Sequence, residues 1–246
     1  MGSFNLSKGE RFSLSKAAPG LTIVRIGMGW DPNEEPNGPD FDLDVSAFAI
    51  GNNFKIPSDS YFVFYGQVRM GNSIEDSKEK GLFRPITDDK SILGAIDDPD
   101  GKRSDGDDDE DMIIDLTKVN DKIEQIIICA SICKYPNDNK KDRRTLDQNF
   151  GMVDDCYIRI VNESTGEEIL RFNLAKESTT SSSKKKATGH MIIISWKASK
   201  KTWFVIPPIF NEMLKRIMTY TIKNDIIAVN NKFCLNVLGI GKMLLS

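Results

Sequence analysis

The chain has 246 residues, of which 39% are hydrophobic and 28% charged, and its formal net charge is -3 at pH 7. This length suits one large β domain or two small ones, and the hydrophobic content is sufficient for a packed core. The near-neutral balance excludes an overall basic surface for nucleic acid. No stretch approaches the roughly 18 consecutive apolar residues of a membrane span, and the first ten residues lack the apolar region of a secretory signal, so we expect a cytoplasmic protein with no membrane span.

The chain contains four cysteines and a single histidine, His190, which limits the metal sites and catalytic sites that it can form. Scattered cysteines in a cytosolic chain of this size do not form a disulfide framework, so we expect them to be reduced and structural. One histidine argues against a zinc site and against a catalytic triad. We therefore predict that the protein is not an enzyme; a hydrolase assisted by a metal with an open coordination position is the alternative.

Short runs rich in β-branched and aromatic residues recur along the chain with turn signals between them, which predicts an all-β fold, an antiparallel β-sandwich. The predicted strands, in chain order, are 21–30, 41–50, 61–68, 91–96, 112–116, 124–132, 155–162, 168–174, 190–196 and 201–206. We expect short helical turns at 117–122 and 145–153, and hairpin turns at 163–167 and 198–201.

The composition changes towards the end of the chain. Residues 1–206 are predicted to form one β-sandwich domain, with a flexible Ser- and Lys-rich linker at about 177–189. Residues 207–246 lack the alternating pattern and are predicted to form an irregular C-terminal tail with one helix at 211–220.

An acidic run spans 97–111 and is offset only by Lys102 and Arg103. Because Gly101 and Gly106 interrupt the run and a strand-like segment follows it, we predict a loop that leads into a sheet. Oxygen ligands on a flexible backbone suit Ca²⁺ better than Mg²⁺. The alternative is a solvated loop that binds no metal.

Neither of two familiar uses of paired acids explains this run. In an EF-hand with Gly101 at the turn position, Ile96 would occupy the first ligand position, and the flanking segments are strands instead of helices. Glycoside hydrolysis needs one acid in an apolar setting, which a polar and Gly-rich loop does not provide.

A second group of acids lies in the predicted strand 41–50. Alternation places Leu43 and Val45 on one face and Asp42 and Asp44 on the other. Carboxylates two residues apart on a strand have Cα atoms about 6.6 Å apart, so both can reach one ion or two adjacent ones. A solvated polar face of the sheet is the alternative.

Asp31 ends the preceding strand, and a polar loop leads from it to Asp42. If the strands that carry these residues are neighbours, as sequential strands often are, their carboxylates converge where the 97–111 loop can also lie. Without a cation, such carboxylates raise one another's pKa and destabilise the fold, so we predict that metal stabilises it.

The order of these motifs resembles the TerD domain family of tellurium-resistance and bacterial stress proteins, which has a eukaryotic branch described as cAMP-binding proteins. The matching segments are LSKGERFSLSK (6–16), GMGWD (27–31), FDLDVSAF (41–48), FVFYGQ (62–67), DGDDDEDMIIDLTKV (105–119) and QNFGMVDDCYIRIVNESTGEEILRFNL (148–174). The acidic loop is one Asp longer than the family pattern, the last strands depart from it, and nothing after Pro207 matches.

The resemblance implies a β-sandwich that binds Ca²⁺ and acts in stress response as a non-enzymatic, metal-dependent binding module for unidentified protein partners. Carried onto matching positions, it implies the metal ligands Asp31, Asp42, Asp44, Asp107, Asp108, Asp109, Glu110 and Asn149. As an alternative, it implies binding of cAMP, whose phosphate would be held by bound Ca²⁺ or near Arg159, Arg171 and Trp203.

Overall fold

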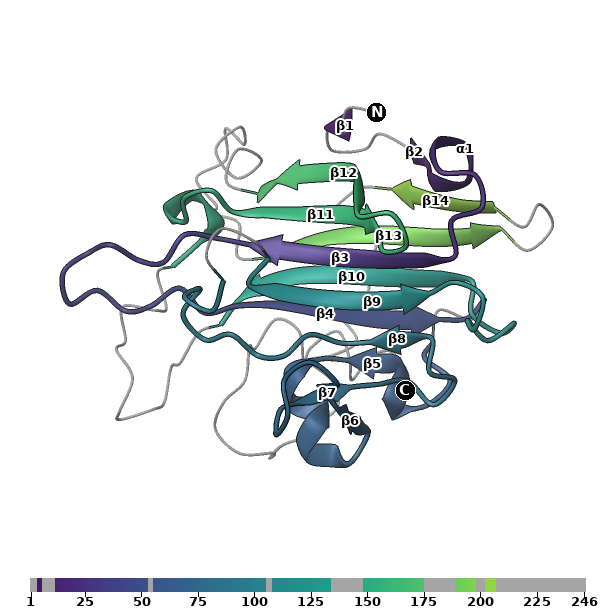
Figure 1. Cartoon of the computed structure of the whole chain (residues 1–246), viewed down its shortest axis with the longest axis horizontal. Helices are drawn as coiled ribbons and strands as arrows, with labels where there is room; N and C mark the ends of the chain where they lie inside the picture. Colours follow the sequence, from purple (N-terminus) through teal and green to yellow (C-terminus); the bar gives the residue numbers. More distant parts are fainter. Residues whose placement is uncertain are drawn as a thin grey trace.

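Two six-stranded β-sheets face each other and enclose the core (Figure 1). This computed structural model describes residues 4–5, 12–52, 55–104, 108–133, 148–174, 189–197 and 202–206. The arrangement is all-β with few short helices, as the sequence predicts. No helix in these ranges is long and apolar enough to cross a membrane.

The first sheet, called sheet A, contains the two strands that flank the acidic loop. Its order is β1 (Phe4–Asn5), β12 (Glu167–Asn173), β11 (Tyr157–Asn162), β3 (Ile23–Gly29), β9 (Glu110–Asp115) and β8 (Ile92–Leu93). All neighbours are antiparallel except β1 and β12.

The second sheet, called sheet B, contains the strand with Asp44 and is antiparallel throughout. Its order is β2 (Phe12–Ser13), β14 (Thr202–Ile206), β13 (Gly189–Lys197), β10 (Gln125–Ile132), β4 (Leu43–Ile50) and β5 (Phe62–Val63). A separate hairpin pairs β6 (Ser73–Glu75) with β7 (Phe83–Pro85). The helical elements are α1 (Leu14–Ala17) and 3-10 helices at Asp59–Tyr61, Tyr65–Met70 and Phe150–Met152.

Alternation explains why sheet A has one buried and one partly exposed face. In β9, Glu110, Met112 and Ile114 are buried while the residues between them are only partly buried. In β4, by contrast, every residue is buried, so both faces of this strand are covered. The polar face that the sequence predicts on β4 therefore exists, but it does not face solvent.

Two local predictions differ from the structure. The predicted strand 61–68 is a strand only at β5, and a 3-10 helix follows at Tyr65–Met70. Gly66 lies inside that segment, and a Cβ there would come within 2.5 Å of the Phe64 ring, so this conformation requires a glycine. The β6–β7 hairpin was missed because its strands are short and its apolar Phe83 is exposed, which removes the alternating pattern.

Gly189, the last residue of the predicted linker at about 177–189, begins β13. The turn at 163–167 is confirmed, with the amide of Gly166 donating to the carbonyl of Asn162 at 2.8 Å. The hairpin turn at 198–201, most of the linker and the whole tail from 207 lie outside the described residues.

Candidate metal centre

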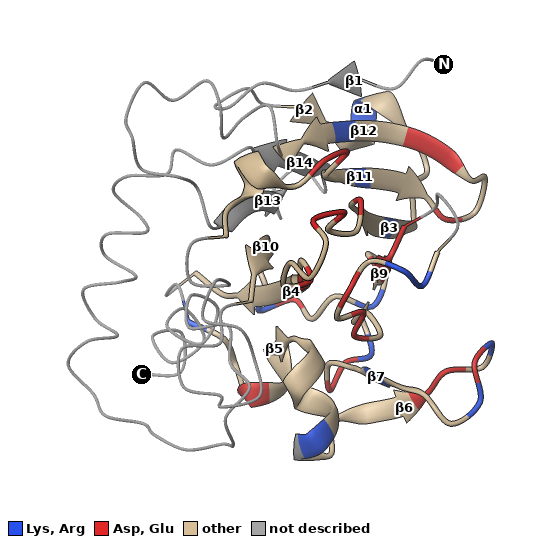
Figure 2. Ribbon diagram, turned by 90° about the vertical axis from the view of Figure 1, so that its left-hand side faces the viewer, with Lys and Arg blue, Asp and Glu red and all other residues tan. Residues whose placement is uncertain are grey.

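The acids gather at one end of the sandwich, where β9 begins and β3 ends. Met28 pairs with Glu110 at this end of sheet A, and β4 begins close by in sheet B. In Figure 2, acidic segments in red lie between β4 and β9. The antiparallel pairing of β3 with β9 thus brings two segments that are far apart in sequence to one edge.

Three carboxylates from three separate segments meet here. Asp44 lies on β4, Asp97 in the loop after β8, and Glu110 at the start of β9, and one oxygen of each lies within 4.8 Å of the others. Asp44 and Glu110 are buried, whereas Asp97 is exposed. The group therefore consists of two buried carboxylates and one at the surface.

Glu110 joins the two sheets through its side chain. Its Oε2 accepts a hydrogen bond from the amide of Val45 at 2.7 Å, and its Oε1 accepts one from the amide of Asp98 at 3.3 Å. Burial raises the pKa of Glu110 well above its ordinary value, and the charges of Asp97 and Asp42 raise it further. A cation at this point would relieve both effects.

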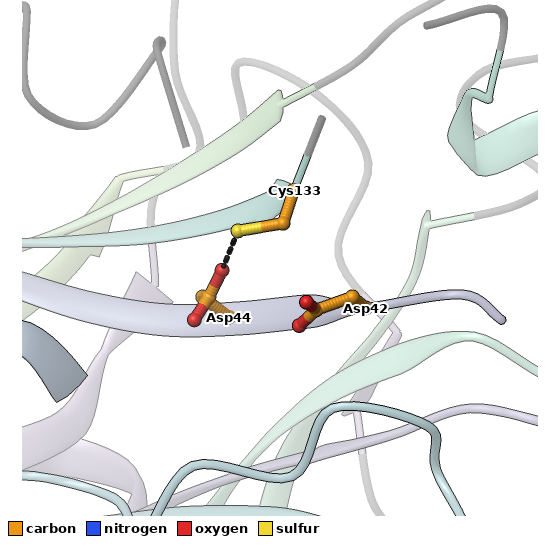
Figure 3. A group of neighbouring side chains, drawn as sticks. All are labelled: Asp42, Asp44 and Cys133. Carbon is orange, nitrogen blue, oxygen red and sulfur yellow. Dashed lines mark hydrogen bonds between the residues drawn. The ribbon is translucent and has the colours of Figure 1, made fainter. Parts of the chain in front are cut away.

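Asp42 and Asp44 form a second group with Cys133, and all three residues are buried (Figure 3). The thiol of Cys133 donates to Oδ2 of Asp44 at 2.7 Å, and the amide of Cys133 donates to the carbonyl oxygen of Asp42, also at 2.7 Å. Asp42 is 6% and Asp44 4% exposed, which contradicts the alternative of a solvated strand face.

The acidic loop is folded, at least over its first part. Oδ1 of Asp98 accepts hydrogen bonds from the amides of Asp100 and Gly101, and Oδ2 accepts one from the amide of Arg103, each at 3.2 Å. Gly101 adopts a positive φ of 68° and lies against the indole of Trp30. Asp98 therefore shapes the turn that presents Asp97.

We expect Asp98→Ala to lower the free energy of unfolding by about 1 to 3 kcal/mol, because the turn amides lose their acceptor. Urea denaturation in the presence of a chelator measures this loss. Asp100→Ala is the matched control: its carboxylate accepts from the exposed Lys102, and such surface pairs contribute little. Equal stability of the two variants would contradict the role of Asp98.

Two other predicted ligands are held by neighbouring groups of the chain. Oδ2 of Asp109 accepts from the amide of Trp30, and its Oδ1 accepts from the hydroxyl of Ser104, both at 2.9 Å. Burial raises the pKa of Asp109. Asp108 forms ion pairs with Arg25 and Arg159. Neither acid is in the groups of close carboxylates found among the described residues.

Asp31 follows β3 and Asp42 precedes β4, and these strands lie in different sheets, so they are not the neighbouring strands that the prediction assumed. Asp31 is in neither group of close ligand atoms found among the described residues. Asp31 is exposed, and its amide donates to the carbonyl of Asp154 at 3.0 Å. Burial, followed by the charges of Asp155 and Asp154, raises the pKa of Asp31. The side chain of Asn149 accepts from the amide of Gly151 and so caps a 3-10 helix. Asp107 lies outside the described residues.

One member of the centre was missing from the predicted ligands. Asp97 belongs to the acidic run, but nothing in the run distinguishes it from its neighbours. Because β8 ends at Leu93, Asp97 lies four residues beyond the strand, and no local signal in the sequence identifies it.

The donor atoms fit a hard divalent cation. Asp44, Asp97 and Glu110 offer carboxylate oxygens, the ligands that Ca²⁺ prefers. The hydroxyl of Ser46, two residues from Asp44 on the same face of β4, is buried and has no hydrogen-bond partner among the described atoms. In this arrangement the thiol of Cys133 serves as a hydrogen-bond donor to Asp44.

Two facing antiparallel sheets with acids gathered at one end define an all-β sandwich-like protein with a candidate metal centre. Residues 2–185 match the TerD domain, so the chain belongs to the TerD domain family. The tellurium resistance protein TerD of Serratia marcescens is 35% identical over 178 residues, which cover 72% of this chain and 78% of that protein. General stress protein 16U of Bacillus subtilis (strain 168) is 34% identical over 176 residues, which cover 71% and 77%.

A solved structure supports the fold. The crystal structure of a homologue of the telluride resistance protein TerD from Streptomyces coelicolor A3(2) matches with a TM-score of 0.51 and 17% sequence identity. The match covers 76% of this chain and 88% of that chain. The family model and these relatives confirm the family resemblance read from the sequence, and the solved structure confirms the fold class.

Proposed function

We propose that this protein is a non-enzymatic Ca²⁺-binding module that acts in stress response. The observation that carries the proposal is the meeting of Asp44, Asp97 and Glu110 within 4.8 Å, although they come from separate segments of the chain. Relatives named as tellurium resistance and general stress proteins support the stress role. The single histidine in the chain supports a role without catalysis.

The chemistry of the centre favours a structural and regulatory use of the cation. Asp44 and Glu110 lie on strands of different sheets, and Asp97 begins the acidic loop. An ion bound by all three residues would connect the acidic loop to both sheets and would order the surface beside the loop. A protein partner could then recognise that ordered surface. Affinities from about 10⁻⁷ to 10⁻³ M are compatible with such a site.

A reducing compartment is part of the proposal. Cys129, Cys133 and Cys156 are buried thiols that form no disulfide among the described residues, and Cys234 lies outside those residues. Free buried thiols are typical of cytoplasmic proteins.

The arginines that could bind the phosphate of cAMP, the alternative ligand, already form ion pairs with carboxylates of this chain. Arg159 holds Asp108, and Arg171 holds Glu168 through two hydrogen bonds of 3.0 and 2.6 Å. A phosphate would have to compete with these carboxylates. The side chain of Trp203 lies outside the described residues.

Thermal melting with and without Ca²⁺ tests the proposal. We expect Ca²⁺ to raise the melting temperature of the unaltered protein and to have no such effect on the double variant Asp42→Asn, Asp44→Asn, which keeps the shape of β4 but removes two charges. Asp121→Asn, in the turn before β10, is the control and should keep the full shift. An undiminished shift in the double variant would remove these two acids from the site.

A further inference from the structure

Asp108 is bound on the outer face of sheet A, away from the carboxylates of the metal centre. Arg25 on β3 and Arg159 on β11 alternate with buried residues of their strands, so both point outwards. Arg159 is paired in register with Gly27, and Tyr157 with Gly29. The side chains of Arg25, Arg159 and Tyr157 surround the carboxylate of Asp108.

Both oxygens of Asp108 are engaged. Arg159 donates from Nε to Oδ1 at 2.7 Å and from a terminal nitrogen to Oδ2 at 2.9 Å, which is the two-pronged geometry that binds a carboxylate firmly. Arg25 donates to Oδ2, and the hydroxyl of Tyr157 donates to Oδ1 at 3.2 Å. The Asp108 side chain is only 3% exposed.

Gly27 creates the space that Asp108 fills. A Cβ at this position would lie 2.1 Å from Oδ2 of Asp108, closer than two such atoms can approach. Any other residue at position 27 would therefore push the carboxylate away from Arg159. The carboxylate of Asp108 thus has its own binding site, which is formed by one glycine, two arginines and one tyrosine.

This binding site for Asp108 determines the direction of the side chains of the next two acids, Asp109 and Glu110. Asp108 is held on the outer face, Asp109 accepts from the amide of Trp30 at the end of β3, and Glu110 reaches inwards to the amide of Val45 on β4. Since β9 begins at Glu110, the anchored Asp108 fixes the position and direction of entry of that strand.

We propose that Asp108 is a positioning residue for the metal centre and not one of its ligands, and that Arg25, Arg159 and Tyr157 set the affinity of the centre by holding Asp108 over Gly27. The inference rests on the proposed function. It is supported by charge as well as geometry, because a divalent cation beside two guanidinium groups is repelled, whereas one at Glu110 is attracted. Groups that orient metal ligands typically change metal affinity by 10- to 100-fold when they are removed.

The test compares two variants that break the same contact from opposite sides, Asp108→Asn and Arg159→Gln. Glu163→Gln is the matched control, because it removes the other carboxylate bound by Arg25 and leaves Asp108 in place. Calorimetric titration with Ca²⁺ measures affinity. The luminescence lifetime of bound Tb³⁺ in H₂O and D₂O, a probe of the same kind of oxygen site, counts the waters on the ion.

We expect both variants to bind Ca²⁺ at least about tenfold more weakly than the unaltered protein, with the same number of waters on bound Tb³⁺. Glu163→Gln should bind Ca²⁺ with unaltered affinity. If Asp108→Asn does not fold, Tyr157→Phe, which removes a single hydrogen bond, should weaken binding in the same direction by a smaller factor.

Three results would overturn the inference. Roughly one extra water on Tb³⁺ in Asp108→Asn, together with undiminished affinity in Arg159→Gln, would identify Asp108 as a ligand. Unchanged Ca²⁺ affinity in Asp108→Asn, with only a lower melting temperature, would show a purely structural role. If the unaltered protein does not bind Ca²⁺, both the proposed function and this inference are wrong. The first two results, by contrast, would contradict this inference alone.

Discussion

Glu110→Gln is expected to abolish the stabilisation of this protein by Ca²⁺. In the unaltered protein, free Ca²⁺ at 100 times the dissociation constant should raise the free energy of unfolding by about 2.7 kcal/mol, because only the folded chain assembles the site. For a domain of this size that corresponds to a shift of about 5 to 10 °C in melting temperature. The variant keeps the size of the buried side chain but removes the charge that attracts the cation.

Differential scanning calorimetry with Ca²⁺ or with a chelator measures both shifts. Asp115→Asn is the control, since Asp115 is an acid at the opposite end of the same strand, β9, where it pairs with Lys118. It should retain the full Ca²⁺ response. A Glu110→Gln protein that is still stabilised by 5 °C or more would exclude Glu110 as a ligand.

Arg84→Met is expected to lower the free energy of unfolding by about 3 to 5 kcal/mol, because it leaves a buried carboxylate without its cationic partner. Arg84 is buried and joins the β6–β7 hairpin to sheet A. It donates to the carbonyls of Gly94 at 2.7 Å and Asp111 at 2.5 Å, and it pairs with Asp76 at 3.5 Å. Arg69→Met, at an exposed arginine in a 3-10 helix, should change stability by less than about 0.5 kcal/mol.

The loss in Arg84→Met should depend on pH. Burial tends to raise the pKa of Asp76, but hydrogen bonds from the amides of Lys78 and Glu79 and the charge of Arg84 outweigh it, so the pKa lies below its ordinary value. An acid with a lowered pKa in the folded state adds stability above its unfolded pKa of about 3.9, and that stability is lost as the pH falls through the folded pKa. Denaturant titrations should therefore find the variant closest to the parent at acidic pH. A difference that stays constant from pH 7 to about pH 3 would contradict this explanation.

Arg84 also links the β6–β7 hairpin to the metal centre. Asp111, which accepts from Arg84, directly follows Glu110, and Arg103 of the acidic loop pairs with Glu79 of the hairpin. Ile74, Leu82 and Phe83 are exposed on or beside this hairpin. Order in the acidic loop and order in the hairpin are therefore coupled by two ion pairs.

The fold class and the central strands could be predicted from the sequence because they depend on local periodicity. The run 124–132 is apolar on both faces and becomes β10, a strand buried on both sides, and alternation in 112–116 matches the buried face of β9. The β6–β7 hairpin could not be predicted, because strands of three residues do not establish a period.

The sequence by itself determined which residues are acidic and that several of them lie in loops beside strands, since composition and spacing are properties of the chain alone. Only the tertiary structure decided their roles: Glu110 and Asp44 face each other across two sheets, Asp97 joins them, and Asp108 turns away to Arg25 and Arg159. The physical reason is that strand pairing in both sheets sets these neighbours: β9 of sheet A brings Glu110 to Asp44 on β4 of sheet B, whereas Asp108, two residues earlier, pairs with arginines of β3 and β11. Which of them meets a cation and which meets a guanidinium depends on partners more than 40 residues away, about which local pattern carries no information.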